Sequence, residues 1–482
     1  MRVLDHLEPA SVFHYFEEIC GIPHTSFHEK ELSDYCADFA RKRNLYFEQD
    51  ALGNVIIIAP ATPGYEDEEA IILQGHLDMV GDKAADCELD LEKDGLRLGI
   101  DGDWIYAEKT TLGGDDGVAV AYGLALLDAK DIPHPRLEVV FTVSEEVGLL
   151  GATGIDLSCC QAKRLLNIDS EEEGILTVSC AGGAHAAVRI PMTANECALD
   201  SAEIRISGLK GGHSGAEIDK GRANATITLG RVLQALVDEL EVRLVSAEGG
   251  LKDNAIPNAA RAVIALEDGK LPRAQEICAE LQDTFRREYA AADPDVTVTF
   301  TPGTVASQAL TLRDTKKVCC FLGLYPNGIE SMSMDIPGLV QTSCNLGIFK
   351  VNGSGLVGSG SVRSSIASRK QLLLRRIGLL AEGLDGTLCV SGEYPAWEYR
   401  RESHLRDVMC KVYKDQYGQD MKVEAIHAGL ECGLFCGKIP GLDAVSFGPN
   451  LYDIHTTSER MSISSVQRVY AYLCAVLQAL KD

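Results

Sequence analysis

Residues 70–80 read AIILQGHLDMV, an apolar run that ends in a glycine, a histidine and an aspartate. The apolar residues predict a buried strand. Because alternate residues of an extended chain point to the same side, His76 and Asp78 are expected on one face at the end of that strand. If His76 binds a metal ion, Asp78 can accept a hydrogen bond from the other ring nitrogen. On its own the pattern is more often incidental polarity at a strand end, so its meaning depends on the rest of the chain.

Strands and helices alternate on both sides of this stretch. Apolar residues at helical spacing predict helices at 9–20, 29–42, 118–127, 405–417 and 466–480. Apolar runs predict strands at 54–59, 137–143, 165–168 and 444–447. This alternation is typical of an α/β sheet with helices on its faces.

The pattern changes between residues 186 and 397. Residues 202–300 are expected to fold in the order β-α-β-β-α-β, a ferredoxin-like split unit, and residues 339–397 read β-β-α-β. We therefore predict an α/β sheet-and-helix domain built from residues 1–185 plus 398–482. Residues 186–397 are predicted to form an inserted α+β, ferredoxin-like domain with two lobes.

Composition argues against several classes of partner. The net charge of the 482 residues is −26, whereas nucleic acids and anionic membranes bind basic surfaces. No apolar run is long enough to predict a membrane span, and the N-terminus does not resemble a signal peptide. The 16 cysteines lack a compact spaced framework, so we predict reduced thiols in a cytoplasmic protein. A redox or zinc pair formed by Cys432 and Cys436 is the less favoured alternative, because nothing supplies a second pair.

Further acidic and histidine residues fall at expected strand ends or at a helix entrance. They are Asp115 at a helix entrance, and Glu145-Glu146, Asp169 and His455 after strands. In open α/β sheets the ligand crevice lies at the carboxyl ends of the strands, so these groups are expected to converge with His76. Two histidines and three carboxylates suit zinc, with manganese or cobalt as alternatives. Five ligands fit two ions that share one carboxylate, for which we choose Asp115.

The pair Glu145-Glu146 suggests two different chemical roles for the two residues. Adjacent residues in an extended chain face opposite ways, so one glutamate can coordinate a metal while the other takes a proton from metal-bound water. Water on zinc has its pKa lowered to about 7, which makes that transfer feasible. Two exposed glutamates at a strand end are the alternative. The run Glu171–Glu173 is interpreted as solvated surface.

Three residues of the insert are candidates for substrate contacts. His213 lies in a glycine-rich turn, where it could stabilise an oxyanion. Arg363 could bind a substrate carboxylate with two parallel hydrogen bonds. Asn254 is a further candidate. Each is also compatible with an ordinary loop or surface position.

Several motifs together resemble the M20 metallopeptidase family, in particular its cytosolic aminoacyl-histidine dipeptidases. The resemblance covers nearly the whole chain and rests on Ile22-Pro23-His24, residues 75–80 (GHLDMV), 110–117 (TTLGGDDG), Glu145-Glu146, 169–174 (DSEEEG), 180–183 (CAGG), 210–215 (KGGHSG) and 427–435 (HAGLECGLF). It implies a zinc-peptidase-like catalytic domain covered by an inserted lid domain.

The resemblance also implies roles for the site residues. One zinc ion would be held by His76, Asp115 and Asp169, and the other by Asp115, Glu146 and His455. Glu145 would be the general base, Asp78 would orient His76, and His213 and Arg363 would contact the substrate. Relatives carry Ala-Asp-Asn where this chain has Gly114-Asp115-Asp116, so Asp116 adds a carboxylate beside the bridge.

We therefore predict a dinuclear metal-dependent dipeptidase, with two Zn²⁺ ions or Co²⁺ or Mn²⁺ in their place. A metal-bridging hydroxide would attack short peptides, and the resemblance implies Xaa-His dipeptides such as β-Ala-His. A lid explains small substrates, since a closed crevice has little room for long chains. An M20-type deacylase of N-acyl amino acids and a non-catalytic metal-binding relative are the alternatives. A monomer and a homodimer both stay open.

Overall fold

The computed structural model describes residues 2–481. The chain divides into two compact units. Unit 1 contains the chain up to Cys180, the segment Tyr399–Ala425 and the chain from Leu430 onward. Unit 2 contains Ala181–Glu398 and the short segment Ile426–Gly429, which comes later in the sequence. No helix among the described residues is long and apolar enough to cross a membrane.

Unit 1 is built on an eight-stranded sheet in the order β1-β2-β6-β3-β7-β22-β8-β21. The strands are β1 Tyr46–Gln49, β2 Val55–Ala59, β3 Ile71–His76, β6 Leu137–Thr142, β7 Arg164–Asn167, β8 Ile175–Cys180, β21 Lys422–Ile426 and β22 Asp443–Ser446. Strands β6, β3, β7 and β22 run parallel to their neighbours in this series, so their carboxyl ends share one edge. Every residue of β3 is buried, which explains its continuous apolar run.

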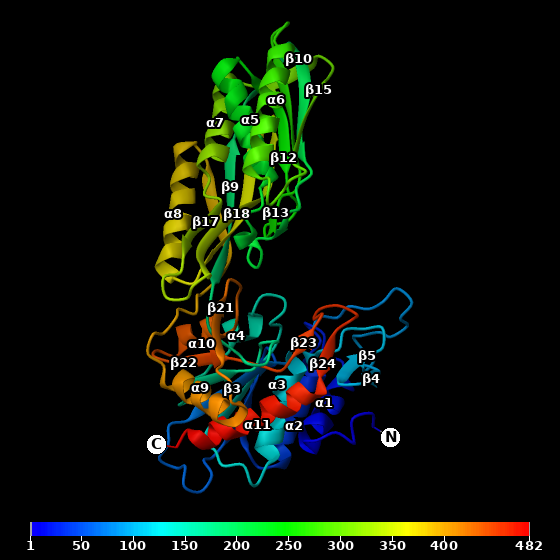
Figure 1. Ribbon diagram of the computed structural model, residues 1–482, viewed down its shortest axis with the longest axis vertical. Coiled ribbons are helices and arrows are strands. Elements are labelled where there is room, and N and C mark those ends of the chain that lie inside the picture. Colours follow the sequence, from blue (N-terminus) through cyan, green and yellow to red (C-terminus); the bar gives the residue numbers. More distant parts are fainter. Residues whose placement is uncertain (1, 482) are drawn as a thin grey trace. The chain divides into compact units, whose positions relative to one another are not determined.

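In the described part of unit 1, seven helices and a small sheet accompany the main sheet. The helices are α1 Ala10–Cys20, α2 Lys30–Lys42, α3 Gly114–Asp128, α4 Leu150–Gly154, α9 His404–Tyr417, α10 Cys432–Lys438 and α11 Ile463–Ala479 (Figure 1). The small sheet has the order β23-β24-β5-β4, with bounds Leu451–Tyr452, Arg460–Ser462, Trp104–Ala107 and Leu98–Asp101. Gly75 allows the start of α3 to approach β3, because a Cβ atom there would lie 2.4 Å from the Cβ of Ala119.

Unit 2 contains a ten-stranded sheet whose main path is β15-β10-β14-β12-β18-β19-β9-β20. Its strands are β9 Gly182–Pro191, β10 Ala194–Ser207, β12 Arg243–Gly249, β14 Ala260–Leu266, β15 Thr297–Pro302, β16 Ala306–Leu310, β17 Gly328–Met332, β18 Val340–Asn352, β19 Gly355–Ser364 and β20 Thr387–Tyr394. The helices are α5 Ala225–Glu239, α6 Leu271–Glu288, α7 Leu312–Leu324 and α8 Ala367–Gly383. A short 3-10 helix, η1 Ile218–Lys220, and the two-residue strands β11 Gly212–His213 and β13 Ala255–Ile256 lie in its loops.

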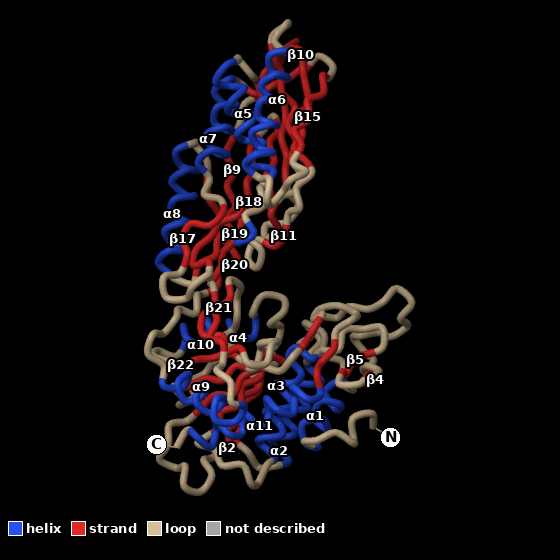
Figure 2. The backbone as a smooth tube through the Cα atoms, in the orientation of Figure 1, coloured by secondary structure: helices blue, strands red, loops and turns tan. Residues whose placement is uncertain are grey.

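Helices cover one face of this sheet and leave the other face open. Ala202, Ile204 and Ile206 of β10 belong to the core that α5 and α6 share, whereas the alternate residue Arg205 is exposed. In Figure 2 the helices of residues 181–398 form a layer beside the strands. The strand period of two therefore separates a buried face from a polar face.

The predicted α/β class is confirmed, and the predicted helices and strands are present with small shifts at their ends. The first half of unit 2 has the expected ferredoxin-like order, β10-α5-β12-β14-α6-β15. The sequence missed β9 and α7, which complete a second β-α-β-β-α-β set with β18, β19, α8 and β20. The two halves are joined edge to edge by β12 and β18, so one continuous sheet runs through both.

Candidate metal centre

The candidate ligands lie at the edge of the sheet where three parallel strands end. His76 is the last residue of β3, Glu145 and Glu146 follow β6, and Asp169 follows β7. Strands β6, β3 and β7 are consecutive neighbours in the sheet. The convergence predicted from strand ends is therefore observed for these residues.

Asp115 lies between the two histidines. Its Oδ1 is 3.1 Å from His76 Nε2, and its Oδ2 is 3.2 Å from His455 Nε2. Asp115 and Asp116 have non-helical backbone angles at the start of α3, so the regular helix begins after them. One carboxylate thus presents each of its oxygens to a different imidazole, which is the arrangement that a bridging ligand requires.

The atoms around Asp115 form two groups of metal-ligand size. Ligand atoms of Asp115, Glu146 and His455 lie within 4.8 Å of one another, as do those of His76, Asp116 and Asp169. His76 Nε2 is also 3.8 Å from Asp169 Oδ1. The predicted residues are thus brought together, and Asp116 is added to them, with its Oδ2 accepting a hydrogen bond from the backbone N–H of His76.

The donor set fits divalent cations. Among residues 2–481, the buried Asp169 Oδ2 has no hydrogen-bond partner, and Glu146 Oε1 makes no hydrogen bond although it lies 2.6 Å from His455 Nε2. Burial, together with the neighbouring carboxylates, raises the pKa of Asp169 well above its ordinary value. Burial likewise raises the pKa of Glu145 to about 8. A cluster of desolvated, mutually repelling carboxylates with an unpartnered oxygen is the environment that a bound cation relieves.

The carboxylate of Asp78 holds the glutamate pair. Its oxygens accept hydrogen bonds from the backbone N–H groups of Glu145, at 2.8 Å, and Glu146, at 3.2 Å. His76 Nδ1 lies closer to the backbone oxygen of Asp78, at 2.9 Å, than to its carboxylate, at 3.4 Å. In a neutral ring whose Nδ1 donates to that carbonyl, the lone pair is on Nε2, so Nε2 is the nitrogen that would bind a cation beside Asp115.

The prediction that Glu145 and Glu146 face opposite ways in an extended chain is wrong. The chain after β6 is not extended, because a turn closes with hydrogen bonds from Gly148 and Leu149 to the backbone oxygen of Glu145. Ligand atoms of both glutamates lie within 4.8 Å of a ring nitrogen of His76 and of each other. Both side chains therefore face the same centre.

The interpretation of Glu171–Glu173 as solvated surface is also wrong for its last residue. The side chain of Glu173 is only 11% exposed, and it makes a two-pronged ion pair with Arg468, with both distances 2.7 Å.

Two buried glutamates near the ligands were missed. Glu459 accepts backbone hydrogen bonds from Leu112, Gly113 and Gly114, at 2.7, 3.2 and 2.9 Å. It lies four residues after His455 in a non-helical loop, where spacing alone does not show that two side chains lie close together. Glu431 is fully buried, and its Oε2 accepts hydrogen bonds from Gln74, at 2.5 Å, and Thr142. Its burial could not be foreseen from a loop motif.

The candidate substrate residues of unit 2 surround Gly215. A Cβ atom on that glycine would lie 3.0 Å from His213 Cε1 and 3.2 Å from Arg363 Cζ. His213 Nδ1 accepts a hydrogen bond from the backbone N–H of Ala216, at 3.0 Å, which leaves the proton of a neutral ring on Nε2. Burial and Arg363 lower the pKa of His213, so the neutral ring is favoured. Asn254 is exposed, and its backbone oxygen binds the N–H of Ser214 at 2.8 Å.

Arg363 has a neighbour that the sequence did not identify as a candidate. His427 is buried, and its Nε2 lies 2.7 Å from Ser343 Oγ. Burial and Arg363 lower the pKa of His427 to about 4, so its ring is neutral at physiological pH. Arg363 donates a hydrogen bond to Tyr394, at 3.1 Å, while its buried Nε has no partner. Among the described residues, the Nε of Arg363 is thus a buried donor whose hydrogen-bonding capacity is unused.

Comparisons with known proteins agree with this geometry. The family model for peptidase family M20/M25/M40 matches residues 72–479. The cytosol non-specific dipeptidase of Escherichia coli K12 is 33% identical over 482 residues, which is 100% of this chain and 99% of that protein. The crystal structure of aminoacylhistidine dipeptidase from Vibrio alginolyticus has a TM-score of 0.94 and 34% identity, and covers 99% of this chain and 98% of that one.

A more distant structure shares the fold. The aminopeptidase PepT of Bacillus cereus is 16% identical, with a TM-score of 0.55 over 99% of this chain and 100% of that one. The resemblance inferred from the motifs is thus confirmed at the level of the family, whose members are metal-dependent peptidases. With a family match over most of its length and a full-length relative at this identity, the chain belongs to the peptidase family M20/M25/M40.

Proposed function

We propose that the protein is a cytoplasmic dinuclear dipeptidase that hydrolyses short peptides, with Xaa-His dipeptides such as β-Ala-His as preferred substrates. The observation that carries the dinuclear site is the position of Asp115, whose two oxygens face His76 and His455 at 3.1 and 3.2 Å. The names of the two full-length relatives, a cytosol dipeptidase and an aminoacylhistidine dipeptidase, support the substrate class and the compartment.

The donor set suggests which residues hold the ions. His76, Asp115 and Asp169 would hold one, and Asp115, Glu146 and His455 the other, with Asp116 as an additional carboxylate near the first. Mixed imidazole and carboxylate ligation suits Zn²⁺. Divalent ions held there would supply Lewis-acid chemistry, which polarises a scissile carbonyl and lowers the pKa of bound water to about 7.

The side chains of the protein are proposed to transfer the proton, stabilise the oxyanion and bind the substrate's carboxylate. Glu145 takes the proton released when water attacks and transfers it to the leaving amine. Asp78 fixes the backbone of Glu145 through the hydrogen bond at 2.8 Å and thereby fixes the direction of the base. His213, neutral and protonated at Nε2, is proposed to donate a hydrogen bond to the developing oxyanion. Arg363 is proposed to bind the substrate's terminal carboxylate, with Asn254 as a further contact.

Metal analysis and a substrate panel on one sample test the proposal. We expect two divalent ions per chain and the highest kcat/KM for β-Ala-His among β-Ala-His, Ala-His, Ala-Ala and Ala-Ala-Ala. N-acetyl-histidine and N-acetyl-methionine belong in the same panel, because an N-acyl amino acid deacylase would use the same metal chemistry. A preference for the acetylated compounds would replace the dipeptidase assignment, and a metal-loaded chain that cleaves none of the panel would contradict any hydrolytic role.

Arg363→Lys is expected to raise KM for dipeptides about tenfold and to leave kcat within about twofold. Lysine keeps the charge but loses the planar pair of donors that matches a carboxylate, at a cost of about 1.5 kcal/mol. Steady-state kinetics on β-Ala-His measure both constants. Arg369→Lys, an exposed change on α8, is the matched control and should leave both unchanged. An unchanged KM in Arg363→Lys would rule out the carboxylate contact.

A further inference from the structure

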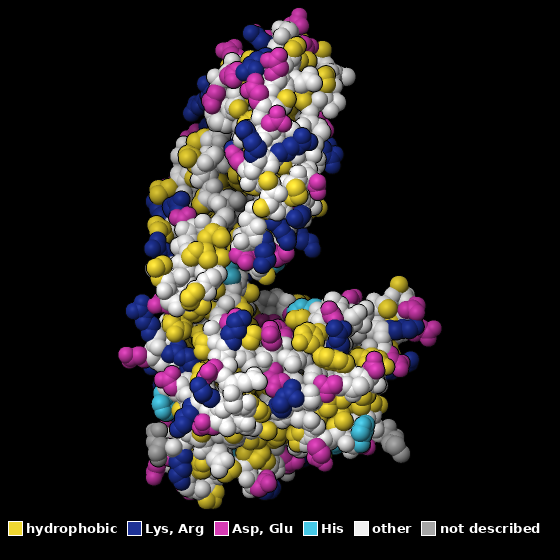
Figure 3. Space-filling view, in the orientation of Figure 1, with side chains coloured by type: hydrophobic (Ala, Val, Ile, Leu, Met, Phe, Trp, Pro, Cys, Tyr) yellow, Lys and Arg dark blue, Asp and Glu magenta, His cyan; other side chains and the backbone are white. Residues whose placement is uncertain are grey.

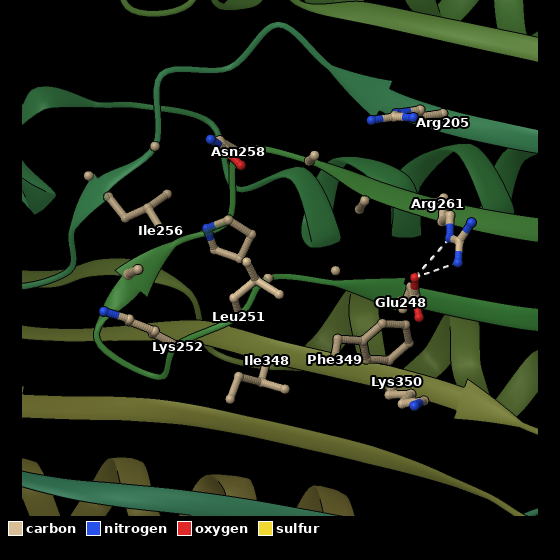
Figure 4. A pocket seen from close by; sticks show the side chains of 18 of the residues that line it. Arg205, Glu248, Leu251, Lys252, Ile256, Asn258, Arg261, Ile348, Phe349 and Lys350 are labelled. Carbon is tan, nitrogen blue, oxygen red and sulfur yellow. Dashed lines mark hydrogen bonds and ion pairs between the residues drawn. The ribbon is translucent and has the colours of Figure 1, made fainter.

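A cavity of about 820 Å³ lies in unit 2 on the open face of the sheet, against β12, β14 and β18. Five basic residues line it, namely Arg205, Lys210, Lys252, Arg261 and Lys350, and Glu248 is its one acidic residue. Figure 4 shows Arg205, Arg261 and Lys350 on neighbouring strands at one end and Lys252 at the other end. All of these residues belong to the segment 181–398.

Strand register places most of these charges in a single row. Arg205 of β10 pairs with Arg261 of β14, which pairs with Glu248 of β12, which in turn pairs with Lys350 of β18. Like charges directly opposite each other on neighbouring strands are destabilising. The row carries three positive charges and one negative charge, so it has unbalanced positive charge at both ends.

The single carboxylate of the row is already used. Glu248 Oε1 accepts a hydrogen bond from Arg261 Nε, at 2.8 Å, and forms an ion pair with Arg261 Nη2, also at 2.8 Å. Within the described part of the chain, Arg205, Lys210, Lys252 and Lys350 form no ion pair with a carboxylate. Figure 3 shows Lys and Arg side chains gathered on this side of unit 2, over the region of β12 and β13. In a chain of net charge −26, a cavity lined mainly by positive charges is expected to attract anions.

The rest of the lining is mainly apolar or glycine. Ile256, Pro257 and Ile348 contribute apolar surface, and Leu251 at the rim is 93% exposed. Such a combination, an apolar floor with a few convergent charges, is typical of sites for small organic ligands. Free inorganic phosphate would use the charges but not the floor.

We propose that this cavity binds a small organic anion, with an apolar or aromatic body and two or more acidic groups. The acidic groups would engage Arg205 and Lys350, and the body would lie toward Ile348 and Leu251. The cavity also borders Gly212 and Ala255 of the two-stranded sheet β11-β13, in which His213 pairs with Ala255. A ligand here therefore contacts the small sheet that carries His213, without using that side chain.

The test uses the metal-loaded full chain and three dyes built from the anilinonaphthalene unit. Bis-ANS has two such units and two sulfonates, ANS has one unit and one sulfonate, and N-phenyl-1-naphthylamine has one unit and no sulfonate. ANS and N-phenyl-1-naphthylamine therefore compare charge on the same apolar body, and sulfonates do not remove the metal as phosphates would. We expect one bis-ANS site per chain, with affinity falling in the order bis-ANS, ANS, N-phenyl-1-naphthylamine. Arg205→Gln/Lys350→Gln should raise the Kd for bis-ANS at least about tenfold, because charge-assisted contacts are lost.

The control variant, Arg286→Gln/Arg287→Gln, removes the same charge from exposed positions on α6 of the same unit. It should keep the wild-type Kd. Equal Kd values in the two double variants, or equal binding of the charged and uncharged dyes to the wild type, would overturn the proposal. The dye series needs no substitution, so it decides the question even if a variant folds poorly.

Discussion

Glu145→Gln is expected to lower kcat for dipeptides about 10²–10⁴-fold while two metal ions per chain are retained. Glutamine has nearly the same shape but no basic oxygen, so it cannot take the proton of the attacking water. The backbone N–H of Glu145 stays available to Asp78, at 2.8 Å, and the turn should therefore keep its conformation. The expected loss of kcat is the loss that follows when a general base is removed, because the proposed metal ligands and substrate contacts are unchanged in this variant.

Two measurements separate loss of a base from loss of a ligand. A carboxylate oxygen of Glu145 lies within 4.8 Å of a ring nitrogen of His76, close enough for both to bind one ion, so metal content must be determined on the same sample as kcat. Glu108→Gln, at an exposed position of unit 1, is the control and should leave both values unchanged. Full activity of Glu145→Gln with both ions bound would remove Glu145 from proton transfer. A variant that has lost an ion would instead make Glu145 a ligand.

Much of the candidate centre could be predicted because its ligands are tied to strand ends. His76, Glu145, Glu146 and Asp169 follow apolar runs, and parallel strands bring their carboxyl ends to one edge. Applying this argument requires only that the strands be recognised from their apolar runs. Such runs are clearest in fully buried strands, such as β3. Asp115 was chosen as the bridge from the ligand count, whereas the assignment of one histidine to each ion came from family resemblance, since no local pattern fixes a distance between distant loops.

The parts that failed depend on tertiary context. The turn after β6 was mistaken for extended chain, because Glu145-Glu146 has no proline or asparagine to mark it, and Gly148 comes later. The alternating strand β9 was missed, and with it the second ferredoxin-like set, because its partners β19 and β20 come far later in the sequence. Carboxylates such as Glu459 and Glu431 look like surface residues until their hydrogen-bond partners are known.

Glu459→Gln is expected to weaken metal binding about 10–100-fold, the usual cost of losing a partner that holds a metal ligand in place. The carboxylate of Glu459 accepts three backbone N–H groups of residues 112–114, and Asp115 is the next residue. An amide in its place turns one acceptor into a donor that faces N–H groups. At least one of these buried groups then loses its partner, at about 1–3 kcal/mol, and the loop that presents Asp115 can shift.

A matched variant distinguishes this role from a general loss of stability. Glu138 is also fully buried, and it accepts backbone hydrogen bonds from Gln161, at 2.9 and 3.1 Å, and from Ala162, at 3.2 Å. Unlike Glu459, it lies near the start of β6, away from the ligands. Both Glu459→Gln and Glu138→Gln should lower the Tm of the metal-free chain, whereas only Glu459→Gln should lose metal in competition with a chelator. Excess Zn²⁺ should restore its activity, because the ligands themselves are intact. If the two variants lower Tm equally and keep the same metal affinity, Glu459 supports the fold and has no influence on how Asp115 is presented to His76 and His455.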